Sequence, residues 1–152
     1  MYRTLIRPLL FRFNPETIHV LTLRLLKLAS RIPLCRKLVK LVFKRSHPSL
    51  ERVVFGIKFP GPVGLAGGLD KNGECYNELS DFGFSFVEIG SLTARPQPGN
   101  PKPRLFRVVE DNAIINRMGI NNEGASNAVR NLVKDRPEVI VAGNIAPNSS
   151  SH

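Results

Sequence analysis

Apolar residues recur at intervals of three and four through residues 14–43, which is the spacing of one face of an α-helix. In the first half of this segment they are Ile18, Leu21, Leu25 and Leu28. Asn14, Pro15 and Glu16 give a good helix start, with a capping side chain, a proline at the first helical position and an acid near the positive end of the dipole. A second, shorter helix is predicted after Pro33, and its apolar face comprises Leu34, Leu38, Leu41 and Val42.

A different rhythm begins at residue 62, where short apolar runs end in small or polar residues. The runs are residues 62–66, 86–90 and 139–143, and the helical patterns between them lie at about 73–82 and 123–134. Strands that alternate with helices predict an α/β fold, with a parallel sheet covered by helices. Residues 53–59 alternate around Gly56 and predict a short β-hairpin ahead of this sheet.

The segment GLAGGLDKNGE, residues 64–74, joins the first run to the first helical pattern. Its glycines remove side chains from a strand-to-helix turn, so a flat or phosphorylated ligand could approach the backbone closely. In parallel sheets ligands bind at the carboxyl ends of the strands, where residues 67–71, Ser91 and Asn144 would lie. Taken alone, such a segment is more typical of an ordinary tight turn with an exposed lysine.

A proline-rich insertion separates the second run from its helix. Four prolines between residues 96 and 103 predict an extended loop. Residues 104–109 and 113–116 then predict a hairpin, which leads into the sequence NRMGINN at 116–122. An Asn amide offers the donor and acceptor that an imide-like edge requires, and Arg suits a carboxylate. The motif therefore fits recognition of a small polar ring, or a polar turn that caps the next helix.

The net charge of +10 comes from the first 45 residues, which hold 11 of the 22 Lys and Arg and one acid, Glu16. A basic amphipathic helical pair has three possible explanations: a solvated basic face on a pair packed against the main domain, a surface-lying membrane anchor, or a nucleic-acid-binding segment. The aromatic residues here are not interleaved with the basic ones, so a nucleic-acid partner is not expected.

Composition restricts the remaining possibilities. Cys35 and Cys75 fit neither a disulfide framework nor metal-ligand spacing, so reduced thiols and no metal are expected. No apolar run reaches the roughly 18 residues of a membrane-spanning helix. The basic, apolar start has no signal-peptide cleavage site after it. With 152 residues, 42% of them hydrophobic, the chain can support one domain-sized core.

Together these motifs resemble the quinone-linked (class 2) dihydroorotate dehydrogenases. The matching segments, in order and spacing over about residues 50–145, are GLAGGLDKNGE, VEIGSLTARPQPGNPKPRLFR, INRMGINN and AGNI. The pattern NPETIH and the basic helical pair match the family's N-terminal extension. The resemblance implies FMN as cofactor, oxidation of (S)-dihydroorotate to orotate in de novo pyrimidine (UMP) biosynthesis, and transfer of the electrons to a membrane quinone.

The resemblance also implies a division of the chain. Its fold class would be α/β, with the first three or so strands of a (β/α)8 TIM-type barrel after an N-terminal amphipathic helical pair. Residues 1–45 would form the extension for membrane and quinone access, 46–61 a linker and short hairpin, 62–145 the FMN-binding barrel part, and 146–152 a divergent tail.

By position in these motifs, the resemblance implies FMN contacts at Gly67, Gly68, Leu69, Asp70, Lys71, Ser91 and Asn144. It implies substrate contacts at Lys71, Asn116, Arg117, Met118, Gly119 and Ile120. The cation of Lys71 would stabilise charge on the flavin or on the orotate carboxylate. The family usually has Thr in place of Ser91 and an aromatic residue in place of Ile120.

Two further residues, His19 and Arg107, correspond to residues that line the family's quinone tunnel. An apolar stripe between the two helices could admit the quinone, while their cationic faces would attract anionic lipid. The resemblance therefore implies a peripheral membrane protein, on the cytoplasmic face of the inner (cell) membrane in a bacterium.

The resemblance stops after Ile145, where the family has Gly-Lys-Asn and this chain has Ala146-Pro147-Asn148 and a serine-rich end. A complete barrel of this type needs roughly 250 residues. The family's catalytic base, a serine on a later loop, has no counterpart here, and Ser149, Ser150 and Ser151 are not assigned to it. We therefore expect this polypeptide to be inactive alone. A non-catalytic remnant of the barrel and a basic nucleic-acid-binding module are the alternatives.

Overall fold

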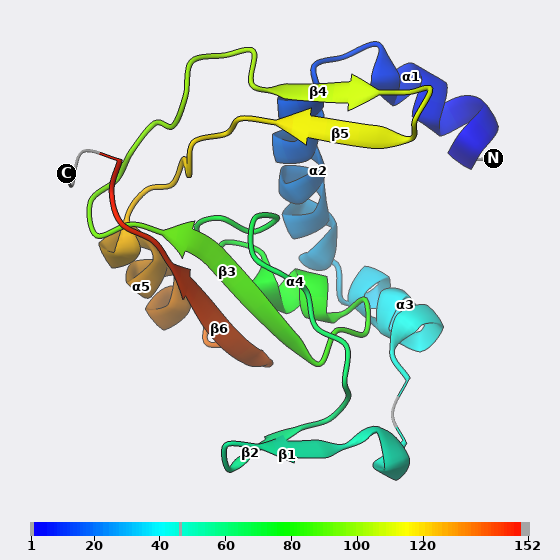
Figure 1. The fold of residues 1–152 in the computed structure, drawn as a ribbon. Helices are drawn as coiled ribbons and strands as arrows, with labels where there is room; N and C mark the ends of the chain where they lie inside the picture. Colours follow the sequence, from blue (N-terminus) through cyan, green and yellow to red (C-terminus); the bar gives the residue numbers. More distant parts are fainter. Residues whose placement is uncertain (1, 46, 150–152) are drawn as a thin grey trace.

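The computed structural model describes residues 2–45 and 47–149, and it divides into a helical extension, a small hairpin and an α/β unit (Figure 1). The extension comprises a π-helix at Tyr2–Ile6, α1 at Arg7–Phe11, α2 at Pro15–Ser30 and α3 at Pro33–Phe43. A 3-10 helix at Pro48–Leu50 and strands β1 (Arg52–Val54) and β2 (Ile57–Phe59) follow. The α/β unit contains α4 (Tyr76–Ser80), β3 (Phe86–Leu92), β4 (Leu105–Val108), β5 (Ala113–Asn116), α5 (Ala125–Lys134) and β6 (Ile140–Ile145).

The predicted start of the first long helix is confirmed. Asn14 Oδ1 accepts hydrogen bonds from the backbone amides of Glu16 at 2.9 Å and Thr17 at 3.3 Å, so it caps α2. The predicted helical pair is therefore α2 and α3, joined by a short turn after Ser30. Within the described residues, every helix is too short or too polar to cross a membrane.

Strands β3 and β6 form the predicted parallel sheet. Their register runs from Phe86 opposite Ile140 to Ile89 opposite Gly143 and shifts before Leu92 pairs with Ile145. The predicted first strand, residues 62–66, lies parallel to β3 but forms a single bridge, Leu65 to Val87. Three backbone hydrogen bonds hold the segment against β3: Ser85 N donates to Val63 O, Leu65 N to Phe86 O and Glu88 N to Leu65 O.

The core lies between this sheet and helices α4 and α5. Its buried members are Tyr76, Val87, Ile89, Leu92 and Ala128. Helix α4 was predicted at residues 73–82 but covers only Tyr76–Ser80. The buried carboxylate of Asp70 explains the shorter helix, because it accepts the amides of Glu74 and Cys75 at 2.8 Å each and so holds the preceding residues in a turn.

Both predicted hairpins are confirmed. Strands β1 and β2 are antiparallel, and β4 and β5 pair from Leu105 opposite Asn116 to Val108 opposite Ala113. The chain after β6 remains attached to the unit, since buried Asn148 donates to Arg95 O at 2.8 Å and to Gln97 Oε1 at 3.0 Å. Residues 150–152 of the predicted tail, Ser46 of the predicted linker and Met1 lie outside the described residues.

Candidate active site

The carboxyl ends of β3 and β6 carry polar residues that the motifs associate with FMN. Ser91 Oγ donates to Asn144 Oδ1 at 2.5 Å, and Asn144 Nδ2 donates to Glu88 Oε1 at 2.6 Å. The Gly67 backbone lies against this group, because a Cβ there would be 3.0 Å from Glu88 Oε1 and 3.5 Å from Asn144 Cβ. At Gly68, the space where a Cβ would stand is open. Glu88, Ser91 and Asn144 thus form a polar group, and the glycine backbone of Gly67 and Gly68 borders it without side chains. We call these five residues the cradle.

Lys71 is half-buried close to this cradle, and its ammonium group donates to the carbonyl oxygen of Gly68. Burial is the largest cause that lowers the pKa of Lys71 from its usual 10.5, and the charge of Arg104 adds to the lowering. The carboxylate of Glu16 acts in the opposite direction and favours the charged form. Lys71 is thus a cation in a partly desolvated position, where it would act more strongly on a bound anion than in water.

A cavity of about 270 Å³ lies beside Lys71, between α2 and the loops at residues 69–75 and 118–123. The predicted site residues that line it are His19, Leu69, Asp70, Lys71 and Met118. Residues predicted for flavin, substrate and quinone therefore meet at one cavity wall. Gly67, Ser91 and Asn144 are grouped instead at the strand ends described above.

Asp70 has a role that the motif did not predict. Its side chain is 2% exposed and accepts the two amides that precede α4. Its backbone oxygen accepts the amide of Gly90 at 3.1 Å, which ties the loop to the end of β3. The carboxylate is therefore committed to holding the loop that carries Lys71, and only the remaining parts of Asp70 face the cavity.

The predicted substrate residues 116–120 follow directly from β5. Asn116, Arg117 and Ile120 are exposed, and Met118 and Gly119 are partly buried. Arg117 Nη2 donates to Pro103 O at 3.1 Å, and its guanidinium lies 5.8 Å from the centre of the Phe106 ring. The side chain of Arg117 is thus held along the β4–β5 hairpin.

The two predicted quinone residues occupy different surroundings. His19 lines the cavity beside Lys71 and a second, apolar cavity of about 440 Å³, which Leu23, Phe43, Phe82 and Phe84 also line. Burial is the main cause that lowers the pKa of His19 from 6.5, and the charge of Lys71 contributes. Arg107 donates to Phe13 O at 2.8 Å and lies 4.5 Å from the centre of the Phe11 ring. Within the described residues, Arg107 is not part of either cavity wall.

A buried ion pair beside the site was not anticipated. Arg104, 6% exposed, binds the carboxylate of Glu16 with two hydrogen bonds, Nη2 to Oε1 at 2.6 Å and Nε to Oε2 at 3.1 Å. The two residues are 88 positions apart, so no local pattern could pair them. The available signal was that Glu16 is the one acid among the first 45 residues, which hold 11 cations.

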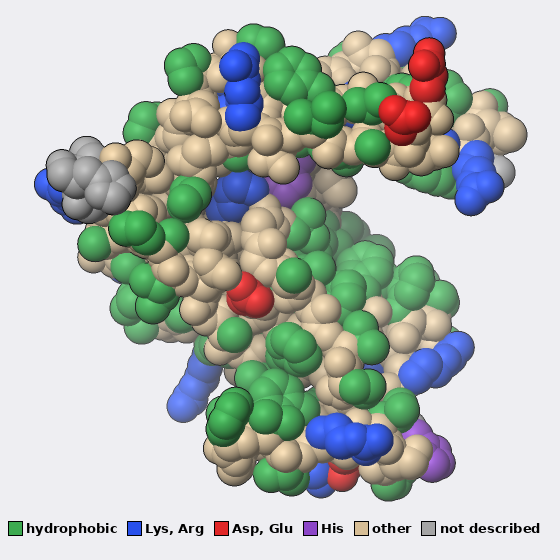
Figure 2. Space-filling view, viewed as in Figure 1, with side chains coloured by type: hydrophobic (Ala, Val, Ile, Leu, Met, Phe, Trp, Pro, Cys, Tyr) green, Lys and Arg blue, Asp and Glu red, His purple; other side chains and the backbone are tan. Residues whose placement is uncertain are grey.

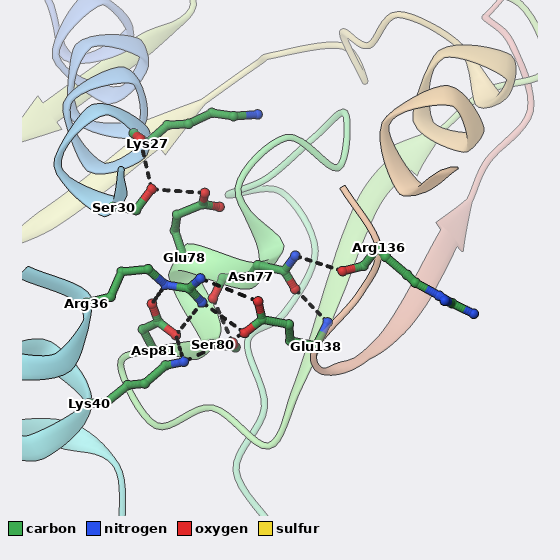
Figure 3. A network of polar contacts seen from close by, with 10 residues as sticks. All are labelled: Lys27, Ser30, Arg36, Lys40, Asn77, Glu78, Ser80, Asp81, Arg136 and Glu138. Carbon is green, nitrogen blue, oxygen red and sulfur yellow. Dashed lines mark hydrogen bonds and ion pairs between the residues drawn. The ribbon is translucent and has the colours of Figure 1, made fainter. Parts of the chain in front are cut away.

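The extension is attached by a second ionic cluster (Figure 3). Arg36 and Lys40 extend from α3 to two carboxylates, those of Asp81 after α4 and Glu138 before β6. Hydrogen bonds from Arg36 raise its own pKa further above its usual value and lower the pKa of Glu138 below 4.5. Arg36 and Lys40 are therefore turned inward, toward the α/β unit, whereas Lys37 and Lys44 are exposed.

The apolar face of the extension is consequently exposed. On α3 the side chains of Leu34, Leu38, Leu41 and Val42 are 63%, 51%, 71% and 58% exposed. Leu21, Leu25 and Leu28 of α2 are exposed as well. Figure 2 shows hydrophobic side chains over much of the surface on this side of the molecule. Apolar patches of this kind usually mark interaction sites for membranes or partners.

The family model for dihydroorotate dehydrogenase matches residues 49–150. A curated relative from Christiangramia forsetii, named dihydroorotate dehydrogenase (quinone), is 51% identical over 99% of this chain and 44% of its own length. A relative of the same name from Methylococcus capsulatus is 49% identical over 97% of this chain and 42% of its own length. The chain thus spans less than half the length of these relatives.

Solved structures give the same picture. The chain resembles ligand-free DHODH from Eimeria tenella with a TM-score of 0.70 and 37% identity, over 88% of this chain and 37% of that one. A crystal structure of the Eimeria tenella enzyme with ferulenol gives a TM-score of 0.63 and 38% identity, over 76% and 36% of the two chains. The predicted fold class, part of a TIM-type barrel preceded by helices, is confirmed.

Proposed function

This chain belongs to the dihydroorotate dehydrogenase family, and on that premise we propose that it contributes to a quinone-dependent enzyme that oxidises (S)-dihydroorotate to orotate. The reaction would use FMN, pass electrons to a membrane quinone and serve pyrimidine synthesis. The observation that carries this proposal is the cradle at the ends of β3 and β6, where Ser91 and Asn144 meet beside the bare backbone of Gly67.

The residues of the cradle fit a flavin. Open backbone at Gly68 leaves room for a flat ring system, and the Ser91 and Asn144 side chains offer groups that can donate to or accept from a ring edge. We assign FMN to Gly67, Gly68, Leu69, Asp70, Lys71, Ser91 and Asn144, with Asp70 acting through its backbone and through the position it gives Lys71. When bound, FMN would supply the acceptor for the hydride that leaves the substrate.

We assign the substrate to Lys71 and to the loop of residues 116–120, which we call the substrate loop. Its members are Asn116, Arg117, Met118, Gly119 and Ile120. Lys71 would bind the orotate carboxylate or stabilise negative charge on the ring, because its ammonium group is partly desolvated. The amide of Asn116 would pair with the ring edge. We assign no general base to the chain.

We assign the quinone to the apolar cavity beneath α2, with His19 at its wall. Arg107 would act from its place beside Phe11 and Phe13, at the start of α2. The outward apolar face of α2 and α3 supports peripheral attachment to a lipid surface, and the remaining exposed cations of the extension favour anionic lipid. In a bacterium this surface would be the cytoplasmic face of the cell membrane.

A chimeric enzyme tests these assignments. This chain would replace the 151 matching residues of the Christiangramia forsetii relative, so that the rest of the barrel is supplied. The purified chimera is expected to retain FMN, to lose its flavin absorbance on addition of dihydroorotate, and to regain it on addition of a quinone analogue. Retained flavin that dihydroorotate does not reduce would contradict the substrate assignment. Absence of flavin, with the relative's own enzyme as control, would contradict the cofactor assignment.

A further inference from the structure

We propose that Arg104 is a positioning residue that couples the first turn of helix α2 to the substrate loop. This inference rests on the proposed function only for the identity of the loop's ligand. The coupling itself concerns contacts among Glu16, Arg104 and the backbone of residues 97–120, and it can be measured without any ligand.

Arg104 lies where three segments meet, just before β4. Two of its hydrogen bonds bind Glu16 on α2, as described above. Its Nη1 atom donates two more, to the carbonyl oxygens of Pro98 at 2.6 Å and Asn100 at 2.9 Å. One guanidinium thus makes four hydrogen bonds, and its planar fork spans directions that a lysine ammonium cannot cover together. Because the group is buried, each of these bonds is shielded from competition by water.

The proline-rich loop that Arg104 holds is itself fastened to the substrate loop. Asn100 donates its amide to Met118 O at 3.0 Å and its side-chain nitrogen to Arg117 O at 2.8 Å. Gln97 Nε2 donates to Gly119 O at 3.2 Å and to Ile120 O at 3.1 Å. Two residues of the proline-rich loop therefore bond four backbone carbonyls of the substrate loop, three through side chains and one through a backbone amide.

The two loops also interlock at two glycines. Gly99 has φ +74°, and a Cβ there would overlap the carbonyl oxygen of Met118 and stand 2.9 Å from Arg104 Nη1. Gly119 has φ +71°, and a Cβ there would stand 2.7 Å from the amide nitrogen of Asn100. The backbones are too close for either loop to shift alone, so a displacement at Arg104 reaches residues 117–120 directly.

Glu16 completes the connection to the extension. It lies in the first turn of α2, one turn before His19, and its side chain is 12% exposed. Lys102 adds a further cation 3.5 Å from Glu16 Oε1. When the apolar face of the extension contacts lipid, a shift of α2 would therefore displace the substrate loop through the buried ion pair between Glu16 and Arg104. Attachment at one end of α2 and order of the substrate loop would depend on each other.

Hydrogen exchange of the full 152-residue chain tests this coupling. The reporters are the amides of Asn100 and Arg117, which bond to Met118 O and Arg104 O. The reference amides are those of Leu65 and Glu88 in the parallel sheet. In Glu16→Gln we expect exchange at the reporters to rise by about tenfold or more, with the reference amides within about twofold of wild type. Glu110→Gln, an exposed glutamate in the β4–β5 turn, is the matched control and should change neither set.

A double-mutant cycle tests whether the effect of Glu16→Gln on the reporter amides acts through Arg104. Arg104→Gln should open the reporters at least as much as Glu16→Gln, and the double variant should open them no further than Arg104→Gln alone. If Arg104→Gln also exposes the reference amides, Arg104→Lys takes its place. Coupling is contradicted if Glu16→Gln leaves the reporters unchanged, if the two effects simply multiply in the double variant, or if Glu16→Gln opens reference and reporter amides equally.

Orotate separates this inference from the proposed function. Added orotate should slow exchange at the reporters in wild type, and Glu16→Gln should require about tenfold more orotate for half of that effect, unlike Glu110→Gln. If orotate leaves exchange at the reporter amides of the wild-type chain unchanged, the substrate assignment fails for this chain. The comparison of exchange rates without ligand still decides the coupling.

Discussion

Arg36 of α3 and Asp81, the residue after α4, form a two-bond ion pair, with Nε 2.7 Å from Oδ2 and Nη2 3.1 Å from Oδ1. The Asp81 side chain is 4% exposed and that of Arg36 is 27% exposed, so this pair is one of the better shielded ionic contacts of the chain. Lys40, 3.2 Å from Asp81, and Glu138 extend it into a network. The geometry explains how a helix with exposed leucines stays docked.

We expect Asp81→Asn to lower the free energy of unfolding by about 1–3 kcal/mol. The substitution leaves Arg36 and Lys40 without their buried partner, although Glu138 and the partial exposure of Arg36 limit the loss. Urea unfolding followed by circular dichroism measures the change. Asp111→Asn, in the exposed β4–β5 turn, is the control and should stay within about 0.5 kcal/mol of wild type. Equal stability of both variants would argue against the network.

Stability should fall in acid through Glu16. Hydrogen bonds from Arg104 are the main cause that holds the pKa of Glu16 below its usual 4.5 in the folded chain. A carboxyl whose folded pKa is lowered contributes its full stability above pH 4.5, and that contribution disappears as the pH falls through the folded pKa. Urea midpoints from pH 7 to 3 should therefore show the gap between wild type and Glu16→Gln closing below pH 4.5. A constant gap would contradict this role.

Gly99→Ala should destabilise the chain by about 2 kcal/mol or more, because it combines a strained φ of +74° with overlap on the Met118 carbonyl. Gly143 offers a matched control, since its Cβ would meet nothing within 4 Å and it has no positive φ. Gly143→Ala is expected to change the urea midpoint little. Similar midpoints for the two variants would show that the loops are less tightly interlocked than described.

Lys71→Met in the chimera should weaken orotate binding by about 10- to 100-fold, the usual loss for one charge-assisted hydrogen bond. Because burial lowers the pKa of Lys71 from 10.5, wild-type affinity should also decline with rising pH before a free lysine would lose its proton. Titrations at pH 7 to 10 measure both effects. Lys134→Met, at the exposed end of α5, is the control. A pH profile that is the same with and without Lys71 would exclude its direct contact with orotate.

Leu38→Gln with Leu41→Gln should reduce binding to anionic vesicles by about tenfold or more. Both leucines lie on the outward face of α3, and each buried leucine contributes roughly 1.5–3 kcal/mol of transfer free energy. Flotation with vesicles that contain phosphatidylglycerol measures the partition. Val133→Gln, 79% exposed on α5, is the control for general surface polarity. Unchanged flotation of the leucine variant would place the attachment surface elsewhere.

Regular elements of this fold could be predicted from the sequence because their signals are local. The capped start at Asn14, the two hairpins and the runs that became β3 and β6 all depend on neighbours within a few residues. One local prediction failed because a side chain overrode the helical pattern. Helix α4 begins later than the predicted residue 73, since the carboxylate of Asp70 accepts the amides of Glu74 and Cys75.

Part of the site could also be predicted, because its motifs are local in the sequence. Motifs identified the glycine-rich loop, and the structure brings Ser91 within hydrogen-bond distance of Asn144, although the two residues are 53 positions apart. No periodicity could show that Glu16 would pair with Arg104, or that Arg36 and Lys40 of α3 would face inward. A helical wheel separates polar from apolar faces, yet it does not say which one the rest of the molecule will contact. Asn148, within the predicted divergent tail, proved to be buried and hydrogen-bonded.

The cations of the extension that face inward also indicate the charge of the surface that the extension covers. Lys27, Arg36 and Lys40 neutralise carboxylates of Asp81, Asp135 and Glu138. Beyond residue 45 the chain has equal numbers of basic and acidic residues, so it carries no net positive charge to replace the cations that the extension supplies. Removing the extension would therefore expose the carboxylates of Asp81, Asp135 and Glu138 as well as apolar surface. A cationic, amphipathic helix added to the shortened chain would then be expected to bind where α3 had been.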